Sequence, residues 1–230
     1  MNPQLFNILF IDIETTAGFR DFSELPERMK PLWERKAAYL KNEKELSGAE
    51  MYSERAAIYA EFGKVICIGV GGYFINKEGK LDFKTKTLSS HSEAELLTEF
   101  SEILEKHKAK EYLKLCAHNG KEFDFPYLSR RMLINNLPLP YLLDLAGKKP
   151  WEVNHIDTME LWKFGDYKHY TSLDLLAAVF DIPSSKSDIS GADVNRVYYE
   201  ENNLEKIADY CERDVKVLAE LYLKLKGEKS

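Results

Sequence analysis

Four carboxylates lie far apart in the sequence, each in a local setting that is unusual for a charged side chain. Asp12 and Glu14 end an apolar run in LFIDIETT, Asp124 lies in HNGKEFDFPYL, and Asp214 lies in IADYCERDV, four residues after Tyr210. Removing an isolated charge from water is costly. A divalent cation offsets that cost, because hard cations bind oxygen ligands. The pattern therefore suggests a carboxylate cage for Mg²⁺ or Mn²⁺, and with it two-metal phosphodiester chemistry.

The first two motifs fit the elements on which they are expected. Asp12 and Glu14 are two residues apart on a strand, so their side chains should leave the same face. Asn119 follows a second strand, and Asp124 falls in the first turn of the next helix, where the helix dipole favours a carboxylate. Each motif alone also has an ordinary explanation, namely a pair of strand-end acids and a helix-start acid beside an Asn-Gly turn.

The third motif places Tyr210 and Asp214 on one face of a helix, because residues four apart are neighbours there. A surface aspartate and a core tyrosine would show the same spacing, so this motif alone carries little weight. The three motifs gain weight because they occur together, each on the type of element it needs.

The hydrophobic pattern predicts a mixed sheet with helices on both faces. The predicted strands cover residues 4–13, 65–74, 81–88, 112–117 and 154–158, and the predicted helices cover 91–108, 122–135, 172–180 and two segments from 192 onward with a break near 202–203. Three strands come first and later strands alternate with helices, which indicates an α/β fold. The first strand should be central and buried on both faces. Ser92 with Glu95 predicts a capping box, and Thr171 or Ser172 should cap the helix at 172–180.

Residues 22–62 differ from the rest of the chain. They are rich in Glu, Lys, Arg and Ala and fall between the first and second predicted strands. We interpret them as a helical insertion whose charged faces are solvated, with a substrate-facing lid as the alternative. The whole chain, 1–230, is expected to form one domain.

The composition narrows the class of protein. The chain has 230 residues, 44% of them apolar, and a net charge of −6, which argues against coating nucleic acid through bulk charge. Its apolar runs are too short to cross a bilayer, and its N-terminus resembles a first strand more than a signal peptide. Three widely spaced cysteines without CxxC spacing argue against disulfides and zinc and favour a cytoplasmic location.

The motifs together carry a resemblance to a known superfamily. The chain resembles the DEDD-type 3′–5′ exonucleases of the ribonuclease H-like superfamily, through Asp12 with Glu14, Asn119 with Phe123 and Asp124, and Tyr-x-x-x-Asp at 210–214. The histidine subtype would need His where Asp209 stands, so the likeness is to the tyrosine subtype, DEDDy. The stretch YTSLDLLAAVFDIPSSKSDISGADV is similar to predicted bacterial exonucleases related to the proofreading domain of family B DNA polymerases. The likeness covers most of the chain, and its matched positions lie outside 22–62.

This resemblance implies a fold, two cofactors and roles for named residues. The fold would be a ribonuclease H-like five-stranded mixed sheet, and the cofactors would be two divalent cations, Mg²⁺ or Mn²⁺. By analogy, Asp12, Glu14 and Asp214 would hold the cation that activates the attacking water. Asp12 would also bridge to a second cation reached by Asp124. Tyr210 would orient the water, because an unperturbed phenol, with a pKa of about 10, is a poor base.

The expected substrate is the 3′ end of a single-stranded nucleic acid, with nucleoside 5′-monophosphates as products. Single strands are held by basic and aromatic side chains. The candidate substrate-binding residues are Thr15, Thr16, Asn119 and Phe123, and further candidates are Phe125, Lys163, Lys168 and His169. Core packing is the favoured alternative for both phenylalanines. We expect His118 to be a structural hydrogen-bonder, Arg130 and Arg131 to be exposed helix charges, and Asp157 to border the site at most.

Several functions remain open at this point. DNA is favoured over RNA as substrate, which suggests a repair or proofreading exonuclease. An exoribonuclease stays open because no motif senses the 2′-hydroxyl. A non-catalytic nucleic-acid binding module is disfavoured by the intact motifs, and an endonuclease is disfavoured by Tyr-x-x-x-Asp.

Overall fold

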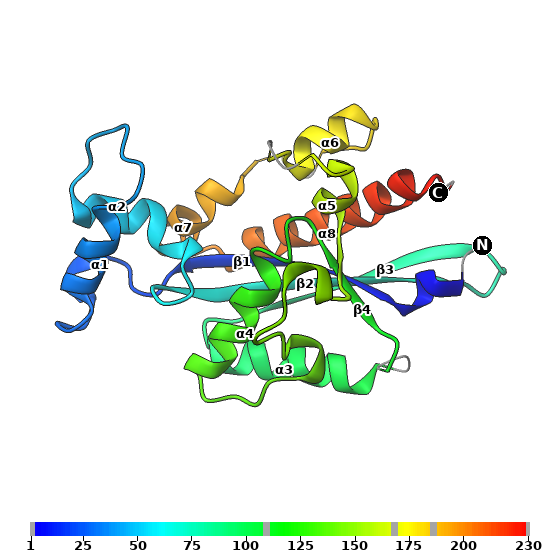
Figure 1. Ribbon diagram of the computed structural model, residues 1–230, viewed down its shortest axis with the longest axis horizontal. Coiled ribbons are helices and arrows are strands. Elements are labelled where there is room, and N and C mark those ends of the chain that lie inside the picture. Colours follow the sequence, from blue (N-terminus) through cyan, green and yellow to red (C-terminus); the bar gives the residue numbers. More distant parts are fainter. Residues whose placement is uncertain (1–2, 108–110, 167–169, 185–187, 229–230) are drawn as a thin grey trace.

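The computed structural model describes residues 3–107, 111–166, 170–184 and 188–228. Its centre is a five-stranded sheet in the order β3-β2-β1-β4-β5 (Figure 1). The strands are β1 (Ile8–Ala17), β2 (Gly63–Ile75), β3 (Leu81–Ser89), β4 (Lys114–Ala117) and β5 (Ile156–Asp157). β1, β2 and β3 form an antiparallel meander, and β4 and β5 run parallel to β1. The sheet is therefore mixed, as the strand pattern predicts.

The first strand begins later than predicted and ends later too. Pro3–Asn7 forms a 3-10 turn, and β1 continues to Ala17 because β2 pairs with it along its whole later half. The register shifts between Glu14 and Thr15, which marks a bulge. Bulges bend a strand and change which side chains face which layer.

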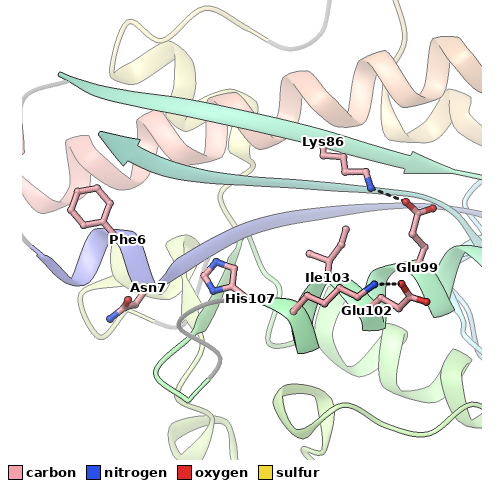
Figure 2. A pocket seen from close by; sticks show the side chains of 8 residues that line it. Phe6, Asn7, Lys86, Glu99, Glu102, Ile103 and His107 are labelled. Carbon is pink, nitrogen blue, oxygen red and sulfur yellow. Dashed lines mark hydrogen bonds and ion pairs between the residues drawn. The ribbon is translucent and has the colours of Figure 1, made fainter. Parts of the chain in front are cut away.

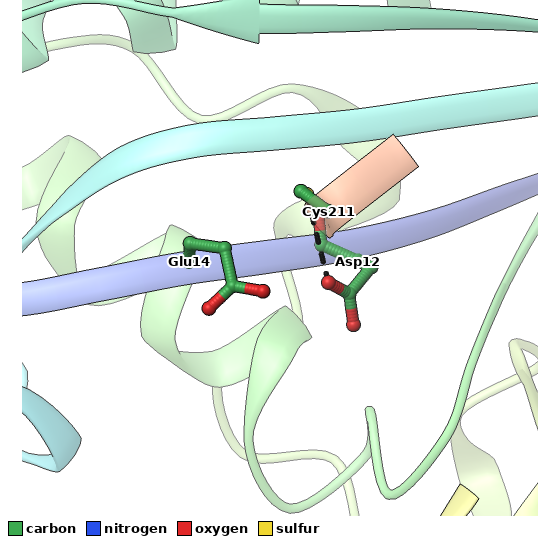
Figure 3. A group of neighbouring side chains, drawn as sticks. All are labelled: Asp12, Glu14 and Cys211. Carbon is green, nitrogen blue, oxygen red and sulfur yellow. Dashed lines mark hydrogen bonds between the residues drawn. The ribbon is translucent and has the colours of Figure 1, made fainter. Parts of the chain in front are cut away.

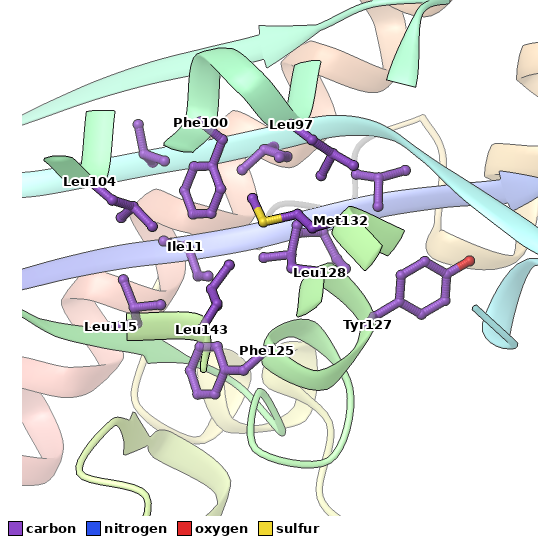
Figure 4. Packing of buried hydrophobic residues seen from close by; sticks show 14 of the residues in the cluster. Ile11, Leu97, Phe100, Leu104, Leu115, Phe125, Tyr127, Leu128, Met132 and Leu143 are labelled. Carbon is purple, nitrogen blue, oxygen red and sulfur yellow. The ribbon is translucent and has the colours of Figure 1, made fainter. Parts of the chain in front are cut away.

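Alternation along β1 builds two hydrophobic cores. Leu9, Ile11 and Ile13 pack into the cluster beneath α3 (Glu93–Lys106) and α4 (Asp124–Ile134), shown in Figure 4. Ile8 and Phe10 pack on the opposite face, against α8 (Leu204–Lys226). β1 is thus central and buried on both faces, as expected of a strand whose apolar run does not alternate.

The helices match the prediction with two corrections. α8 covers one face of the sheet with α5 (Thr158–Lys163) and α6 (Leu173–Val179) beside it, and α3 and α4 cover the other (Figure 1). Ser172 caps α6 by accepting from the Leu175 amide. Ser92 precedes α3 but makes no side-chain cap bond, so the predicted capping box is wrong. The short α5 directly follows β5, where the sequence pattern showed only a strand.

The insertion is helical. It contains α1 (Lys30–Ala37) and α2 (Gly48–Arg55) and extends beyond the end of β1 (Figure 1). Its own core centres on Trp33 and Tyr52, which are fully buried and meet edge to face at 5.2 Å between ring centroids. The Asn195 amide nitrogen donates to the Ser53 carbonyl of α2 at 3.0 Å, which ties the insertion to the C-terminal part of the fold.

The chain approaches α8 through α7 (Val194–Arg196) and a π-helical turn, Val197–Glu201. Asn202 then adopts a left-handed conformation with φ of 49°, and Asn203 caps α8 by accepting from the Lys206 amide at 3.0 Å. The predicted break at 202–203 is therefore correct. Shorter 3-10 turns lie at Phe22–Glu24, Ala56–Ile58, Tyr141–Leu143, Pro150–Glu152 and Gly191–Asp193. None of the helices in the described ranges combines the length and apolar character that a membrane span requires.

Candidate active site

β1 delivers two carboxylates to the face of the sheet that α8 covers. Asp12 and Glu14 follow Ile8 and Phe10 at every second position, and their carboxylates lie on the same side of the strand (Figure 3). Glu14 is only 7% exposed, and Asp12 is half-buried. A carboxylate oxygen from each residue and the Cys211 sulfur all lie within 4.8 Å of one another. The predicted same-face geometry is correct.

Asp124 approaches from the first turn of α4; it lies outside the group of atoms within 4.8 Å but near enough for its charge to act on Asp12 and Glu14. It is 4% exposed, and hydrogen bonding from the Ile13 backbone partly opposes the rise in its pKa. This contact is available because β4 pairs with β1 only from Ile8 to Phe10, which leaves the Ile13 edge open. Burial raises the pKa of Asp124 to about 7. Its charge in turn contributes to the raised pKa values of Asp12 and Glu14.

α8 supplies Tyr210 and Asp214, which are 5% and 8% exposed. The Tyr210 hydroxyl and the Asp214 carboxylate are hydrogen-bonded, and burial together with this carboxylate raises the pKa of the phenol well above its usual range. Among the neighbouring charges, Asp214 has the largest effect on the pKa of both Asp12 and Glu14. The three motifs therefore converge on one buried acidic cluster.

The residues of the cluster fit a divalent cation. Burial first, and mutual repulsion second, raise the pKa values of Asp12 and Glu14 well above the usual range. Within the part of the chain that the structure describes, no lysine or arginine forms an ion pair with Asp12, Glu14 or Asp124. Buried charges without a partner are strongly unfavourable. An all-oxygen set of carboxylates is the donor set that Mg²⁺ and Mn²⁺ prefer.

Cys211 is a neighbour of the site that sequence reasoning missed. Its sulfur lies 3.4 Å from the Asp12 carbonyl oxygen and 3.5 Å from Asp12 Oδ2. Burial and the adjacent Cys67 thiol raise the pKa of Cys211, so the thiol stays neutral and donates to Asp12. Cys211 lies three residues before Asp214, and residues at that spacing lie on the same side of a helix. This spacing was the only feature of the sequence that pointed to Cys211.

Comparison with known proteins identifies the family. Residues 58–229 match the family described as predicted 3′–5′ exonucleases related to the exonuclease domain of PolB. The chain belongs to this exonuclease family. The matched range includes Asn119 with Asp124 and Tyr210 with Asp214, and it begins after β1. Membership makes the chain a nuclease domain with nucleic acid as its substrate.

Solved structures support the fold. Among 85 matching chains is a family B DNA polymerase from the hyperthermophilic archaeon Pyrobaculum calidifontis, with a TM-score of 0.56 and 15% identity. The match covers 95% of the exonuclease-family chain and 24% of the polymerase, so the chain spans about a quarter of that protein. At this identity the likeness shows a shared fold, the ribonuclease H-like sheet. No curated protein sequence matches the chain.

The four residues predicted to bind substrate lie in four different surroundings in this exonuclease-family chain. Thr15 lies beside Tyr127 and hydrogen-bonds its phenol. Thr16 is fully buried and donates to Asn195 Oδ1 at 2.6 Å, so its hydroxyl is engaged inside the fold. Asn119 has a left-handed φ of 62°, and its buried Oδ1 accepts no hydrogen bond from the described residues. Phe123 is half-buried and packs on Tyr127 at 5.3 Å between ring centroids.

The other candidates sort into core and surface. Phe125 is fully buried against His155, which confirms core packing for that ring. Lys163 is half-buried at the end of α5, whereas Lys168 and His169 lie outside the described residues. Tyr170, which sequence reasoning missed, is 68% exposed, and partial burial of its hydroxyl first, then the nearby carboxylates of Asp124 and Asp157, raise its pKa. An exposed aromatic ring therefore lies beside the acidic cluster.

Of the predictions for three flanking residues, two are confirmed and one is wrong. His118 bonds Thr158 Oγ1 at 2.9 Å and the Thr171 carbonyl at 2.8 Å, which confirms its structural role. Arg130 is exposed as expected. Arg131 is not, because its side chain forms a buried ion pair with Glu93, Nε to Oε1 at 2.8 Å. That pair joins α4 to α3 behind the site.

A pocket of about 780 Å³ lies away from the acidic cluster, between the N-terminal turn, β3 and α3 (Figure 2). Its lysines are matched by glutamates: Lys86 pairs with Glu99 at 2.7 Å and Lys106 with Glu102 at 2.6 Å. This neutral lining offers neither a cluster of unpaired acids nor a positive surface for phosphates.

Proposed function

We propose that the chain is a metal-dependent 3′–5′ exonuclease that shortens single-stranded DNA from its 3′ end and releases nucleoside 5′-monophosphates. The observation that carries this proposal is the meeting of β1, the start of α4 and α8 at one buried cluster of four acids, with a tyrosine hydroxyl bonded to one of them. Family membership supports the reaction class, and the residues support the mechanism.

The acids divide between two cations in this proposal. Asp12, Glu14 and Asp214 would hold one, and Asp12 with Asp124 would hold the other. Two such cations lower the pKa of an attacking water and stabilise the leaving 3′ oxygen. The raised carboxylate pKa values support a bound cation, because burial first and repulsion second disfavour the charged acids, and a cation offsets both.

Tyr210 would orient the attacking water and not deprotonate it. Its phenol has a pKa raised well above the usual range, so it stays protonated at neutral pH. A protonated phenol bonded to Asp214 can hold a water by hydrogen bond but has no capacity to accept its proton as a base. The expected effect of Tyr210 is thus on geometry.

The substrate side of the site would use an amide and aromatic rings. The Asn119 oxygen is buried without a partner among the described residues, and a buried polar atom of this kind calls for one. A terminal nucleotide would supply a donor to it. Phe123 and the exposed Tyr170 offer rings on which a splayed base can stack. Thr15 is the weaker candidate, because its side chain already contacts Tyr127.

We further propose one domain over 1–230, because the insertion is bonded to the rest of the fold through Asn195. A reducing compartment such as the cytoplasm suits the three free buried cysteines.

The test is degradation of 5′-labelled single-stranded DNA and RNA with Mg²⁺ or Mn²⁺. Asp12→Asn and Asp214→Asn should abolish activity, whereas Asp21→Asn, at an exposed acid just before the insertion, should not. A ladder that shortens from the 3′ end of DNA supports the proposal. Shortening of RNA alone would reassign the substrate, and intact polymers with both cations would refute the activity.

A further inference from the structure

Asp157, at the end of β5, is a buried carboxylate that the family motifs do not include. It is 3% exposed. Its Oδ1 accepts from the backbone amides of Asn119 at 3.0 Å, Met159 at 2.9 Å and Glu160 at 3.4 Å, and its Oδ2 accepts from the amide of Lys121 at 3.1 Å. One side chain therefore satisfies amides of two segments that are far apart in the sequence.

Two of these amides, from Met159 and Glu160, belong to the first turn of α5. An aspartate there is an ordinary helix cap, which satisfies amides that the helix leaves without partners. Capping explains only these two bonds. The other two, to Asn119 and Lys121, cross from β5 to the loop after β4, and the bond to Oδ2 comes from that loop.

That loop is the segment that presents Asp124. It begins at Asn119, whose left-handed φ of 62° is unusual for a residue other than glycine. The Asn119 carbonyl accepts from the Phe123 amide at 3.0 Å, and the Gly120 carbonyl accepts from the Phe125 amide at 2.9 Å. The loop therefore leads straight into the first turn of α4, and its position determines where Asp124 lies.

A neighbouring contact joins the same two segments. His118 Nδ1 bonds Thr158 Oγ1 at 2.9 Å, one residue before Asn119 and one residue after Asp157. Two consecutive residue pairs thus fasten the loop to the start of α5.

We propose that Asp157 is a positioning residue of the nuclease reaction. By holding the backbone at Asn119 and Lys121 it keeps Asp124 directed at the cluster, and so sets the affinity for the cation that Asp124 would hold. This inference rests on the proposed function. Residues that support metal ligands in this way commonly change metal affinity or activity 10- to 100-fold when replaced.

The test is Asp157→Asn with Mn²⁺ as the probe. Asparagine caps helices about as well as aspartate, so α5 should keep its cap. The side-chain NH₂ of asparagine would then face a backbone N–H of the loop, and because both groups are donors, that hydrogen bond would be lost. We expect the Mn²⁺ concentration for half-maximal activity to rise about tenfold. The rate should return to near the wild-type value at saturating Mn²⁺. Electron paramagnetic resonance should show one of two bound Mn²⁺ ions weakened.

Two variants provide the comparison. Asp124→Asn should lose the second Mn²⁺ ion and stay inactive at any Mn²⁺ concentration. Asp193→Asn makes the same charge change at another turn where a carboxylate accepts a backbone amide, from Ser190 at 3.0 Å, and should leave the Mn²⁺ dependence unchanged. If Asp157→Asn does not fold, Asp157→Ser keeps a capping oxygen for α5 and is too short to hold the loop, with the same expectation.

The outcomes separate the two proposals. An unchanged Mn²⁺ dependence in a folded variant at position 157 overturns the inference, and so does a rate lowered equally at every Mn²⁺ concentration. Wild-type protein that neither binds Mn²⁺ nor degrades DNA overturns the proposed function itself.

Discussion

Asp124→Asn should stabilise the metal-free protein at neutral pH while destroying its activity. The Asp124 carboxyl is 4% exposed, and burial raises its pKa from 3.8 to about 7. A carboxyl whose pKa is higher in the folded state than in the unfolded state contributes stability that is fully present below about pH 4. That stability is lost as the pH rises through about 7. Asparagine is neutral at every pH, so the variant keeps this stability at pH 7.

The size of the effect follows from the shift. About three pKa units correspond to about 4 kcal/mol in the free energy of unfolding at pH 7. This is an upper value, because the carboxamide replaces an oxygen that hydrogen-bonds the Ile13 backbone. For a chain of 230 residues, 4 kcal/mol corresponds to a rise in Tm of about 8–16 °C.

The assay is thermal unfolding followed by circular dichroism in EDTA, at pH 4 and pH 7. Asp124→Asn should exceed the wild type in Tm at pH 7 and match it at pH 4. The control Asp21→Asn, at an exposed acid, should follow the wild type at both. Adding Mn²⁺ at pH 7 should raise the Tm of the wild type more than that of Asp124→Asn, since binding to the folded state stabilises it.

One result would refute this reasoning. If Asp124→Asn in EDTA is no more stable than the wild type at pH 7, the metal-free carboxyl is not held in an unfavourable charged state. The cluster would then be tolerated without a cation, and the electrostatic argument for a metal site would fail.

Three further predictions concern the site and its support. Tyr210→Phe should keep Mn²⁺ binding in a calorimetric titration but lower kcat about 10- to 100-fold, as expected for one hydrogen bond to a charged or reacting group; an unchanged kcat would remove Tyr210 from the mechanism. Arg131→Leu leaves the buried Glu93 carboxylate with its bonds from Val65 and Asn135 but without its cation, and should lower the free energy of unfolding in urea by about 3–5 kcal/mol; a loss below 1 kcal/mol would contradict a stabilising buried pair. Gly120→Ala would bring Cβ to 2.4 Å from the nearest side chain and should destabilise the fold by about 1–3 kcal/mol, whereas Gly191→Ala, with open space around it, should not.

The sequence predicted best where one local pattern decides the structure. Asp12 and Glu14 share a face because side chains alternate along a strand. Tyr210 and Asp214 share one because a helix repeats every 3.6 residues. Both predictions depend on period alone, and the structure places both pairs as expected. The position of Asp124 in the first turn of a helix was also predicted from local sequence, because the helix dipole favours a carboxylate there.

The errors arise where a distant segment decides. Thr16 was expected to face substrate, but the bulge after Glu14 changes the register, and Thr16 is buried on Asn195. Arg131 was expected in solvent, but α3 brings Glu93 to it. Asp157 was expected to border the site at most, and its bonds to the amides of Lys121 and Asn119, 36 and 38 positions away in the chain, have no local sequence signal. Patterns of neighbouring residues in the sequence do not predict these contacts.

The site joins the first strand to the last helix of the described chain: Asp12 and Cys211, hydrogen-bonded there, are 199 positions apart. On the proposed function, a chain that has folded only in part would lack the complete cage, and so would lack nuclease activity that could damage nucleic acid before folding finishes. A cation held by Asp12 and Asp214 would also act as a reversible crosslink between β1 and α8. Slowed amide exchange in α8 would then report occupancy of the site directly.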